Sequence, residues 1–357
     1  MKVRQLKEVI MEHFGTTNWS EFSSRFWRDS DKIPDFHGQP DHQLKFKLPY
    51  YASEHPLIPS IEEINRVMDE NPMHPFNWDI YGNPSGMRRH NVCRIGPCLI
   101  KRDGVKQSAL VHEVENMLYL QEHSKVRTAK VYAFFSDSKR YYLVTEFLEG
   151  KMLLDGFEPL DKPTRDIISS KLAEQLQLLR ATPSPGYYGR VNGQPFDPMF
   201  PGMETNFRNF YGLFYHYDDL LTAMYRGAEV RMALCTRDNY LEEQVKFLTD
   251  FKPILGATKD PKPVLTFRDI KRANMLLNSV RDSSGNIVDW TVTLVDWHML
   301  EWLPGWAQAV CIEWHYAQSK KPNILHHMKI LLESLGDDST KECDFLFDGG
   351  RVGYYIC

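Results

Sequence analysis

Apolar and polar residues follow helical spacing near the start of the chain. Apolar residues recur every three or four positions over residues 3–14 and again over residues 19–26, which predicts two amphipathic helices. The pattern is lost over residues 29–59, and a capping-box sequence predicts a third helix from Ser60. We expect residues 1–75 to form a helical extension whose aromatic faces pack on the rest of the protein. The alternative is that these faces bind a partner protein or a substrate.

A pattern of period two begins near residue 91. It predicts two short strands over residues 91–95 and 98–101, joined by a Gly-Pro turn. A helical pattern follows over residues 111–121, and a second hairpin is predicted over residues 128–147. We therefore expect residues 76–150 to form a small, mainly antiparallel β domain.

Helical spacing dominates the remainder, residues 151–357. A long helix is predicted from about Asp161 to Leu179, with a proline in its first turn. Aromatic residues follow helical spacing over residues 207–217 and 302–316, which predicts two further helices with these rings in the core. The alternative for the first aromatic stripe is a wall for an aromatic or polycyclic substrate. The chain is predicted to be an α+β protein with a small β domain and a larger, mostly helical domain.

Three residues with side-chain oxygens occupy distinctive places between residues 267 and 297. Asp269 is followed by Asn274, then by an apolar strand, a polar turn and a second apolar strand that ends at Asp296. A loop Asp can accept the proton of an attacking hydroxyl, and the oxygens of Asn and Asp suit a hard cation. Each residue alone could be a turn cap or a strand end. The order and setting of all three together predict a phosphotransfer site.

The same segment resembles a known family. Phe267-Arg268-Asp269-Ile270-Lys271-Arg272-Ala273-Asn274 resembles the catalytic loops of protein kinases and of the aminoglycoside phosphotransferase and choline kinase group. Val295-Asp296-Trp297 favours the second group, because protein kinases have Phe-Gly after the metal-binding Asp. Leu303-Pro304-Gly305-Trp306 also resembles the small-molecule kinases, in particular the fungal aminoglycoside-phosphotransferase-like branch. The resemblance extends from about Asn91 to Ser319.

This resemblance implies a two-lobed, protein-kinase-like α+β fold. The first 75 residues would pack on the kinase body, residues 76–150 would form the nucleotide-binding N-lobe, and residues 151–357 would form the helical C-lobe. The C-lobe would carry the catalytic and metal-binding loops and the acceptor site. The implied cofactors are ATP and Mg²⁺.

The resemblance also implies roles in the C-lobe. Asp269 would be the catalytic base, and Asn274 and Asp296 would bind the metal ion. Lys271, two residues after the base, is expected to lie against the transferred phosphate.

In the N-lobe, Lys101 occupies the position of the phosphate-binding lysine. Glu113 is expected to pair with Lys101, and Glu115 is the competing partner for the same ammonium. Backbone groups of Glu146 and Leu148 are expected to bind the adenine edge of the nucleotide.

Three departures from the family pattern stand out. Phe267 replaces the usual His, His298 replaces the Glu often found in fungal members, and no Gly-x-Gly-x-x-Gly precedes Lys101. The turn-forming cluster over residues 81–86 is a candidate to fold over the phosphates; the alternative is an ordinary surface turn. None of these departures removes Asp269, Asn274, Asp296 or Lys101.

Composition and charge narrow the range of partners. The 357 residues are 42% apolar and 25% charged, and the net charge is −4. This balance gives no electrostatic reason to expect nucleic acid or an anionic membrane as a partner. The six cysteines have neither the spacing of a zinc site nor the density of a disulfide framework, and no run has signal-peptide or membrane-spanning length. We therefore expect a cytoplasmic protein.

The predicted function is transfer of the γ-phosphoryl group of ATP to a hydroxyl group of a small molecule. Secondary metabolites are among the candidate acceptors. Two alternatives stay open. One is a pseudokinase or nucleotide-binding module that acts through a protein partner, and the other is a kinase fold that catalyses another ATP-dependent ligation or group transfer. The sequence leaves open the identity of the acceptor and of any protein partner.

Overall fold

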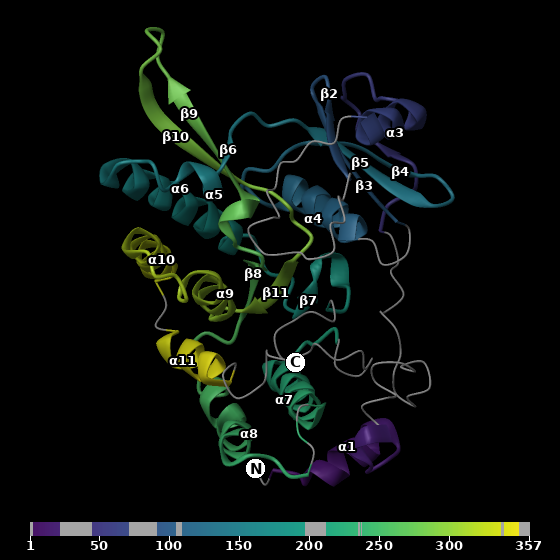
Figure 1. Ribbon diagram of the computed structural model, residues 1–357, viewed down its shortest axis with the longest axis vertical. Coiled ribbons are helices and arrows are strands. Elements are labelled where there is room, and N and C mark those ends of the chain that lie inside the picture. Colours follow the sequence, from purple (N-terminus) through teal and green to yellow (C-terminus); the bar gives the residue numbers. More distant parts are fainter. Residues whose placement is uncertain are drawn as a thin grey trace.

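A computed structural model describes most of the chain (Figure 1). The described residues are 3–21, 45–70, 91–104, 109–196, 212–234, 236, 238–336 and 339–349. The candidate turn at residues 81–86 lies outside these ranges, as do residues 22–26 and 207–211 of the two predicted helices over residues 19–26 and 207–217.

The small lobe is built on a five-stranded antiparallel sheet with the order β1-β4-β5-β3-β2. Its strands are β1 (Tyr50–Tyr51), β2 (Val92–Ile95), β3 (Cys98–Gly104), β4 (Val131–Ser136) and β5 (Arg140–Glu146). Helix α4 (Ala109–His123) packs on one face of the sheet, and α3 (Ile61–Glu70) packs on the other. Both predicted hairpins and the predicted helix between them are confirmed.

Alternation along β3 decides which side chains face which helix. Cys98 and Ile100 join the cluster under α3. Successive side chains of a strand point to opposite faces, so Lys101 points to the face that α4 covers. Its cross-strand partner Leu143 belongs to the core cluster that contains α4, in agreement with this placement.

The larger lobe is mostly helical. Its helices are α5 (Leu153–Gly156), α6 (Lys162–Arg180), α7 (Tyr217–Leu234), α8 (Glu242–Leu255), α9 (Ala307–Tyr316), α10 (Pro322–Leu335) and α11 (Thr340–Gly349). The Asp161 side chain accepts the Thr164 N–H at 2.9 Å and so caps α6 where the sequence predicted a helix start.

The described part of this lobe also contains two small sheets and two 3-10 turns. The first sheet contains β10 (Ile287–Leu294), β9 (Met275–Arg281) and β6 (Lys151–Met152), and the second contains β7 (Gly189–Arg190), β11 (Leu300–Pro304) and β8 (Pro263–Phe267). The turns are η3 (Val191–Gly193) and η5 (Arg272–Asn274). One hydrophobic cluster contains residues of α4, α6, β8, α9 and α10 and thereby joins the lobes. The chain has a two-lobed, protein-kinase-like α+β fold.

Two aromatic stretches differ from the helices predicted for them. Trp302 lies in β11, and every residue of this strand is buried. A strand buried on both faces shows no alternation, so its apolar run cannot be told from a buried helix by pattern alone. Phe214 precedes α7 and forms a β-bridge with Tyr188. The helical prediction was wrong at both residues.

The first 75 residues contact both lobes. Helix α1 (Leu6–Phe14) packs on α7 of the large lobe, whereas β1 extends the small sheet and α3 covers its outer face. The boundary at residue 75 stays a prediction, because residues 71–90 lie outside the described ranges.

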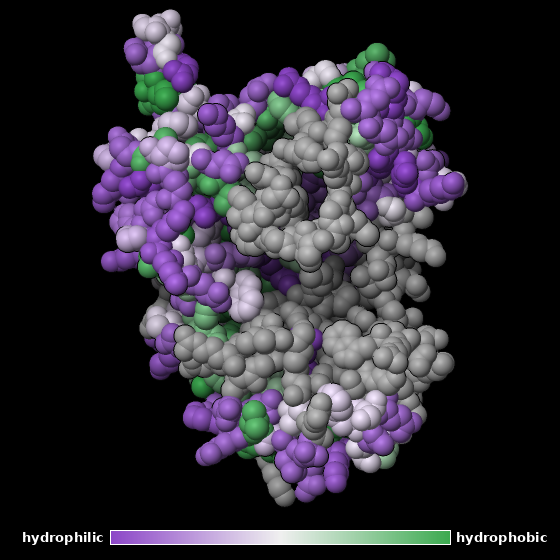
Figure 2. Space-filling model, in the orientation of Figure 1, coloured by the Kyte–Doolittle hydropathy of each residue, from purple (hydrophilic) through white to green (hydrophobic). Residues whose placement is uncertain are grey.

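The hairpin of β9 and β10 extends beyond the body of the large lobe (Figure 1). Figure 2 shows a hydrophobic patch below its polar tip, and exposed Val280, Ile287 and Val288 belong to this hairpin. Within the described ranges, no helix is both long and apolar enough to cross a lipid bilayer.

Candidate active site

Lys101 lies between two carboxylates that come from different lobes. Its Nζ donates to Glu113 Oε1 at 2.6 Å and to Asp296 Oδ1 at 3.3 Å. Burial alone would lower the pKa of Lys101, but the Asp296 and Glu113 carboxylates raise it above its ordinary value. Burial raises the pKa of Glu113, and the Lys101 ammonium opposes that rise. The ammonium is therefore fixed at the place where the small sheet faces the end of β10.

Helix α4 is held in place by two further polar residues. Glu115, the alternative partner for Lys101, instead accepts from Arg190 Nη2 at 3.1 Å and from Gln194 Nε2 at 2.9 Å. Asn116 Nδ2 donates to the Trp297 carbonyl at 2.6 Å. These contacts tie α4 to the large lobe and so fix the position of Glu113.

Asp269 follows β8 and lies in a network with its own loop. Its Oδ2 accepts from Lys271 Nζ at 2.6 Å and from Asn274 Nδ2 at 2.8 Å. The Asn274 Nδ2 also donates to the Asp269 carbonyl at 3.0 Å. Oδ1 has a different neighbour, His315 Nε2 of α9, at 3.7 Å. Oδ1 is therefore the oxygen that remains available to an incoming hydroxyl.

The residues predicted to bind metal fit a hard cation. Asn274 is fully buried, and its Oδ1 has no hydrogen-bond partner within the described part of the chain. Burial raises the pKa of Asp296, but Lys101 and His298 outweigh it and hold the pKa well below its ordinary value. One ionised carboxylate and one unpaired amide oxygen suit a hard divalent cation such as Mg²⁺.

The backbone at Asp296 has an unusual conformation. Its φ of 65° is in the left-handed region, which costs a non-glycine residue free energy. His298 Nδ1 lies 3.4 Å from Asp296 Oδ1. Burial lowers the pKa of His298, but the hydrogen bond and charge of Asp296 raise it above its ordinary value. The sequence identified His298 only as a departure from the family pattern and did not predict this contact.

Phe267, the other departure in this segment, is part of the core. Its ring lies 4.8 Å from that of Trp297, and the side-chain amide of Gln308 bonds both its N–H and its carbonyl at 3.1 Å. The next residue, Arg268, donates to Glu301 Oε2 at 3.0 Å, and both side chains are buried. These contacts support the loop beneath Asp269 and place Arg268 in a structural ion pair.

The predicted adenine-binding segment follows β5. The Glu146 N–H donates to the Lys130 carbonyl at 2.8 Å, so this donor is already used within the lobe. The Leu148 N–H donates to no group in the described ranges. The Glu146 carbonyl accepts from Thr145 Oγ1 at 3.3 Å and has a second lone pair. The Leu148 N–H and this second acceptor position of Glu146 are therefore the groups to test for nucleotide binding.

His315 is a candidate that the sequence did not indicate. Burial lowers its pKa below the ordinary value, while the Asp269 carboxylate opposes this. His315 is 46 residues from Asp269 in the sequence, within an aromatic stretch predicted to be packing. No local pattern marks it, because only the packing of α9 brings it to Asp269.

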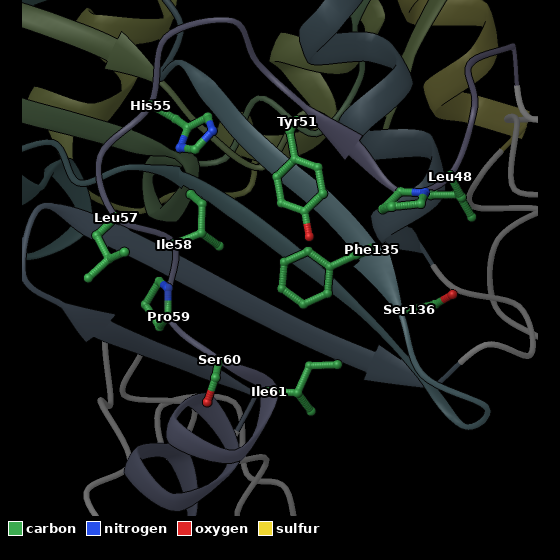
Figure 3. A pocket seen from close by; sticks show the side chains of 11 residues that line it. Leu48, Tyr51, His55, Leu57, Ile58, Pro59, Ser60, Ile61, Phe135 and Ser136 are labelled. Carbon is green, nitrogen blue, oxygen red and sulfur yellow. The ribbon is translucent and has the colours of Figure 1, made fainter.

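A separate pocket of about 680 Å³ lies at the edge of the small sheet (Figure 3). It is lined by nine of the residues between Leu48 and Ile61 together with Phe135 and Ser136. None of these residues belongs to the cluster around Lys101, Asp269 and Asp296. The pocket therefore has no direct part in the predicted chemistry.

Comparison with known proteins decides the family. A family model described as "Phosphotransferase enzyme family" matches residues 95–304, more than half of the chain. The chain belongs to this phosphotransferase family. The matched region of the phosphotransferase includes Lys101, Asp269 and Asp296. The resemblance inferred from the sequence is confirmed at the level of the family.

Among solved structures, the phosphotransferase is similar to one titled "Structure of the GDP and kanamycin complex of APH(2")-IIia". The sequence identity is 12% and the TM-score is 0.42, over 78% of this chain and 86% of the other. No curated protein matches the phosphotransferase.

Proposed function

We propose that this phosphotransferase moves the γ-phosphoryl group of ATP, with Mg²⁺, to a hydroxyl group of a small molecule. One observation carries the proposal. Lys101, Glu113, Asp269, Asn274 and Asp296, which come from four separate segments, meet in one site with an ordered set of contacts. The proposal includes membership of the fungal aminoglycoside-phosphotransferase-like branch and a secondary metabolite as the acceptor.

In this mechanism, Lys101, Asp296 and Asn274 would bind the nucleotide and its metal ion. Lys101, oriented by Glu113, would contact the nucleotide phosphates, and the backbone of Glu146 and Leu148 would contact the adenine. Asp296 and Asn274 would hold Mg²⁺, which supplies charge neutralisation at the β- and γ-phosphates.

Asp269 would act on the acceptor. Its Oδ1 would accept the proton of the acceptor hydroxyl as the oxygen–phosphorus bond forms and the bond to the leaving ADP breaks. Lys271, 2.6 Å from Asp269 Oδ2, would lie against the transferred phosphoryl group. In such a loose transition state, catalysis comes from positioning and charge neutralisation.

Product masses test this proposal. The full chain is incubated with ATP, Mg²⁺ and a panel of hydroxylated small molecules that includes aminoglycosides, choline-like amines, sugars and secondary metabolites. A mass gain of one phosphoryl group on an acceptor, with release of ADP, is the expected result. Release of AMP would favour another group transfer. No turnover with any acceptor, together with tight binding to another protein, would favour a pseudokinase.

A further inference from the structure

Three side chains present metal-binding atoms to one point near the end of β10. Asp269, Asp296 and His298 each offer a ligand atom, and these atoms all lie within 4.8 Å of one another. His298 Nδ1 and Asp296 Oδ1 are 3.4 Å apart. Neighbouring ligands held about 2.1 Å from one octahedral ion are about 3.0 Å apart. The imidazole nitrogen and the carboxylate oxygen would therefore have to move closer by only about 0.4 Å to bind the same ion.

A second observation at this point is independent of the acidic residues. The Asn274 amide lies against Asp269, because its Nδ2 donates to Asp269 Oδ2 at 2.8 Å. Both neighbours of Asn274 Nδ2 are oxygens that can only accept, so this atom must be the amide nitrogen. The other terminal atom of the side chain is therefore the amide oxygen, Oδ1. This Oδ1 is buried and has no partner within the described residues. Buried polar atoms almost always have a partner, so this amide oxygen is expected to bind a hydrogen-bond donor or a cation.

The backbone around His298 is also held in place. Asn116 Nδ2 donates to the carbonyls of Trp297 and His298, at 2.6 and 3.3 Å. The left-handed conformation of Asp296 precedes this segment. Such outer contacts orient metal ligands in known sites.

We infer that His298 is a nitrogen ligand of the divalent ion at Asp296, so that the centre prefers Mn²⁺ to Mg²⁺. This inference rests on the proposed function, because it refines the metal centre of that site. Mg²⁺ takes mainly oxygen ligands and gives up its waters reluctantly. Imidazole binds transition-metal ions more strongly than it binds Mg²⁺. An added nitrogen ligand therefore increases affinity for Mn²⁺ more than affinity for Mg²⁺.

Electron paramagnetic resonance of Mn²⁺ bound to the full chain tests the inference without any turnover. The spin echo of the parent should show modulation by an imidazole nitrogen. His298→Gln should abolish this modulation and weaken Mn²⁺ binding by about tenfold or more. Affinity for Mg²⁺, measured by competition, should change by less than about threefold.

Two further variants sharpen the test. His298→Glu puts a carboxylate oxygen in place of the imidazole nitrogen. The metal preference of this variant should therefore move towards Mg²⁺, and its spin echo should lack the nitrogen modulation. His326→Gln changes an exposed histidine of α10 that pairs with Asp166 and should leave signal and affinities unchanged. Unchanged melting temperatures of the two His298 variants would show that they fold.

Failure of this inference can be told from failure of the proposed function. Absence of the nitrogen signal in the parent, or its persistence in His298→Gln, would overturn the inference even if Mg²⁺ supports phosphoryl transfer. Loss of the signal in His315→Gln but not in His298→Gln would overturn it too. A parent that shows the signal but transfers no phosphoryl group would keep the inference and contradict the function.

Discussion

At the scale of single residues, the position of one ammonium group organises the site. Lys101 bonds both Glu113 and Asp296, so it links the small lobe to the proposed metal-binding carboxylate. Lys101→Met should raise the KM for nucleotide or lower kcat by tenfold or more, which corresponds to at least about 1.4 kcal/mol. Steady-state kinetics measure this effect. Lys139→Met, a change at an exposed lysine in the β4–β5 turn of the same lobe, should have no effect.

Glu113 should act through the same ammonium. Glu113→Gln is therefore expected to be milder than Lys101→Met, and the two changes together should cost less than their sum. Strict additivity in a double-mutant cycle would discredit the pairing.

His327 provides a prediction about pH. Its Nδ1 lies 2.7 Å from Ser169 Oγ, and because Oγ itself donates to the Arg165 carbonyl, Nδ1 carries the proton. Burial lowers the pKa of His327 to about 3, against about 6.5 in an unfolded chain. Between pH 3 and pH 6.5 the unfolded chain binds a proton at this histidine and the folded chain does not. The contribution of neutral His327 to the free energy of unfolding is therefore fully present above about pH 6.5 and is lost as the pH falls towards 3.

The free energy of unfolding should therefore fall by up to about 1.4 kcal/mol per pH unit below pH 6.5 through this residue. His327→Asn, which cannot titrate, should show a shallower slope in urea unfolding between pH 6.5 and 5. The neighbouring exposed Leu325→Gln, which changes no titratable group, should retain the parent slope. Equal slopes in the parent and His327→Asn would contradict this account.

At the scale of elements, α4 depends on a buried ion pair. Glu115 and Arg190 are both about 1% exposed, and removal of one partner of such a pair typically costs about 3 to 5 kcal/mol. Glu115→Ala should lower the free energy of unfolding by this order and should also raise the KM for nucleotide, since α4 carries Glu113. Denaturant unfolding and kinetics measure the two effects. Glu122→Ala, at an exposed position of α4, is the matched control, and equal effects would contradict the anchoring role.

Elements with a clear pattern could be predicted from the sequence, whereas the fully buried strand β11 could not. The β2–β3 hairpin alternates, and α6 begins with a cap and a proline, so both were found. In β11 every residue is buried, and Trp302 was assigned to a helix. The order of Asp269, Asn274 and Asp296 marked the candidate site. Contacts such as Asn116 to Trp297 join residues 181 positions apart and leave no local pattern.

At the scale of the whole molecule, the N-terminal residues stabilise both lobes. Leu6, Val9 and Ile10 of α1 are buried, and Arg4 Nη2 bonds Glu229 Oε2 of α7 at 2.7 Å. Deletion of residues 1–75 would also remove β1 and α3. The truncated protein should expose apolar surface and aggregate or melt at a lower temperature.

A point change isolates the contribution of α1. Ile10→Ala should cost about 2 to 5 kcal/mol of stability, whereas the exposed Met11→Ala on the same helix should cost little. Thermal and denaturant unfolding compare the stabilities of Ile10→Ala and Met11→Ala.

For the deletion of residues 1–75, a soluble, fully active truncated protein would show that the extension is a separate tail.

The central claim is that Asp296 binds metal and Asp269 acts as the base, and Mg-ATP binding tests it most directly. A ligand at a hundred times its Kd stabilises a fold by roughly 2.7 kcal/mol, which a melting curve detects. Asp296→Asn should abolish turnover and shrink the Mg²⁺-dependent melting shift. Asp269→Asn should keep most of the shift while the rate falls by about 10² to 10⁴. Variants that both bind Mg-ATP and turn over like the parent would contradict the account, as would a parent that shows no shift at all.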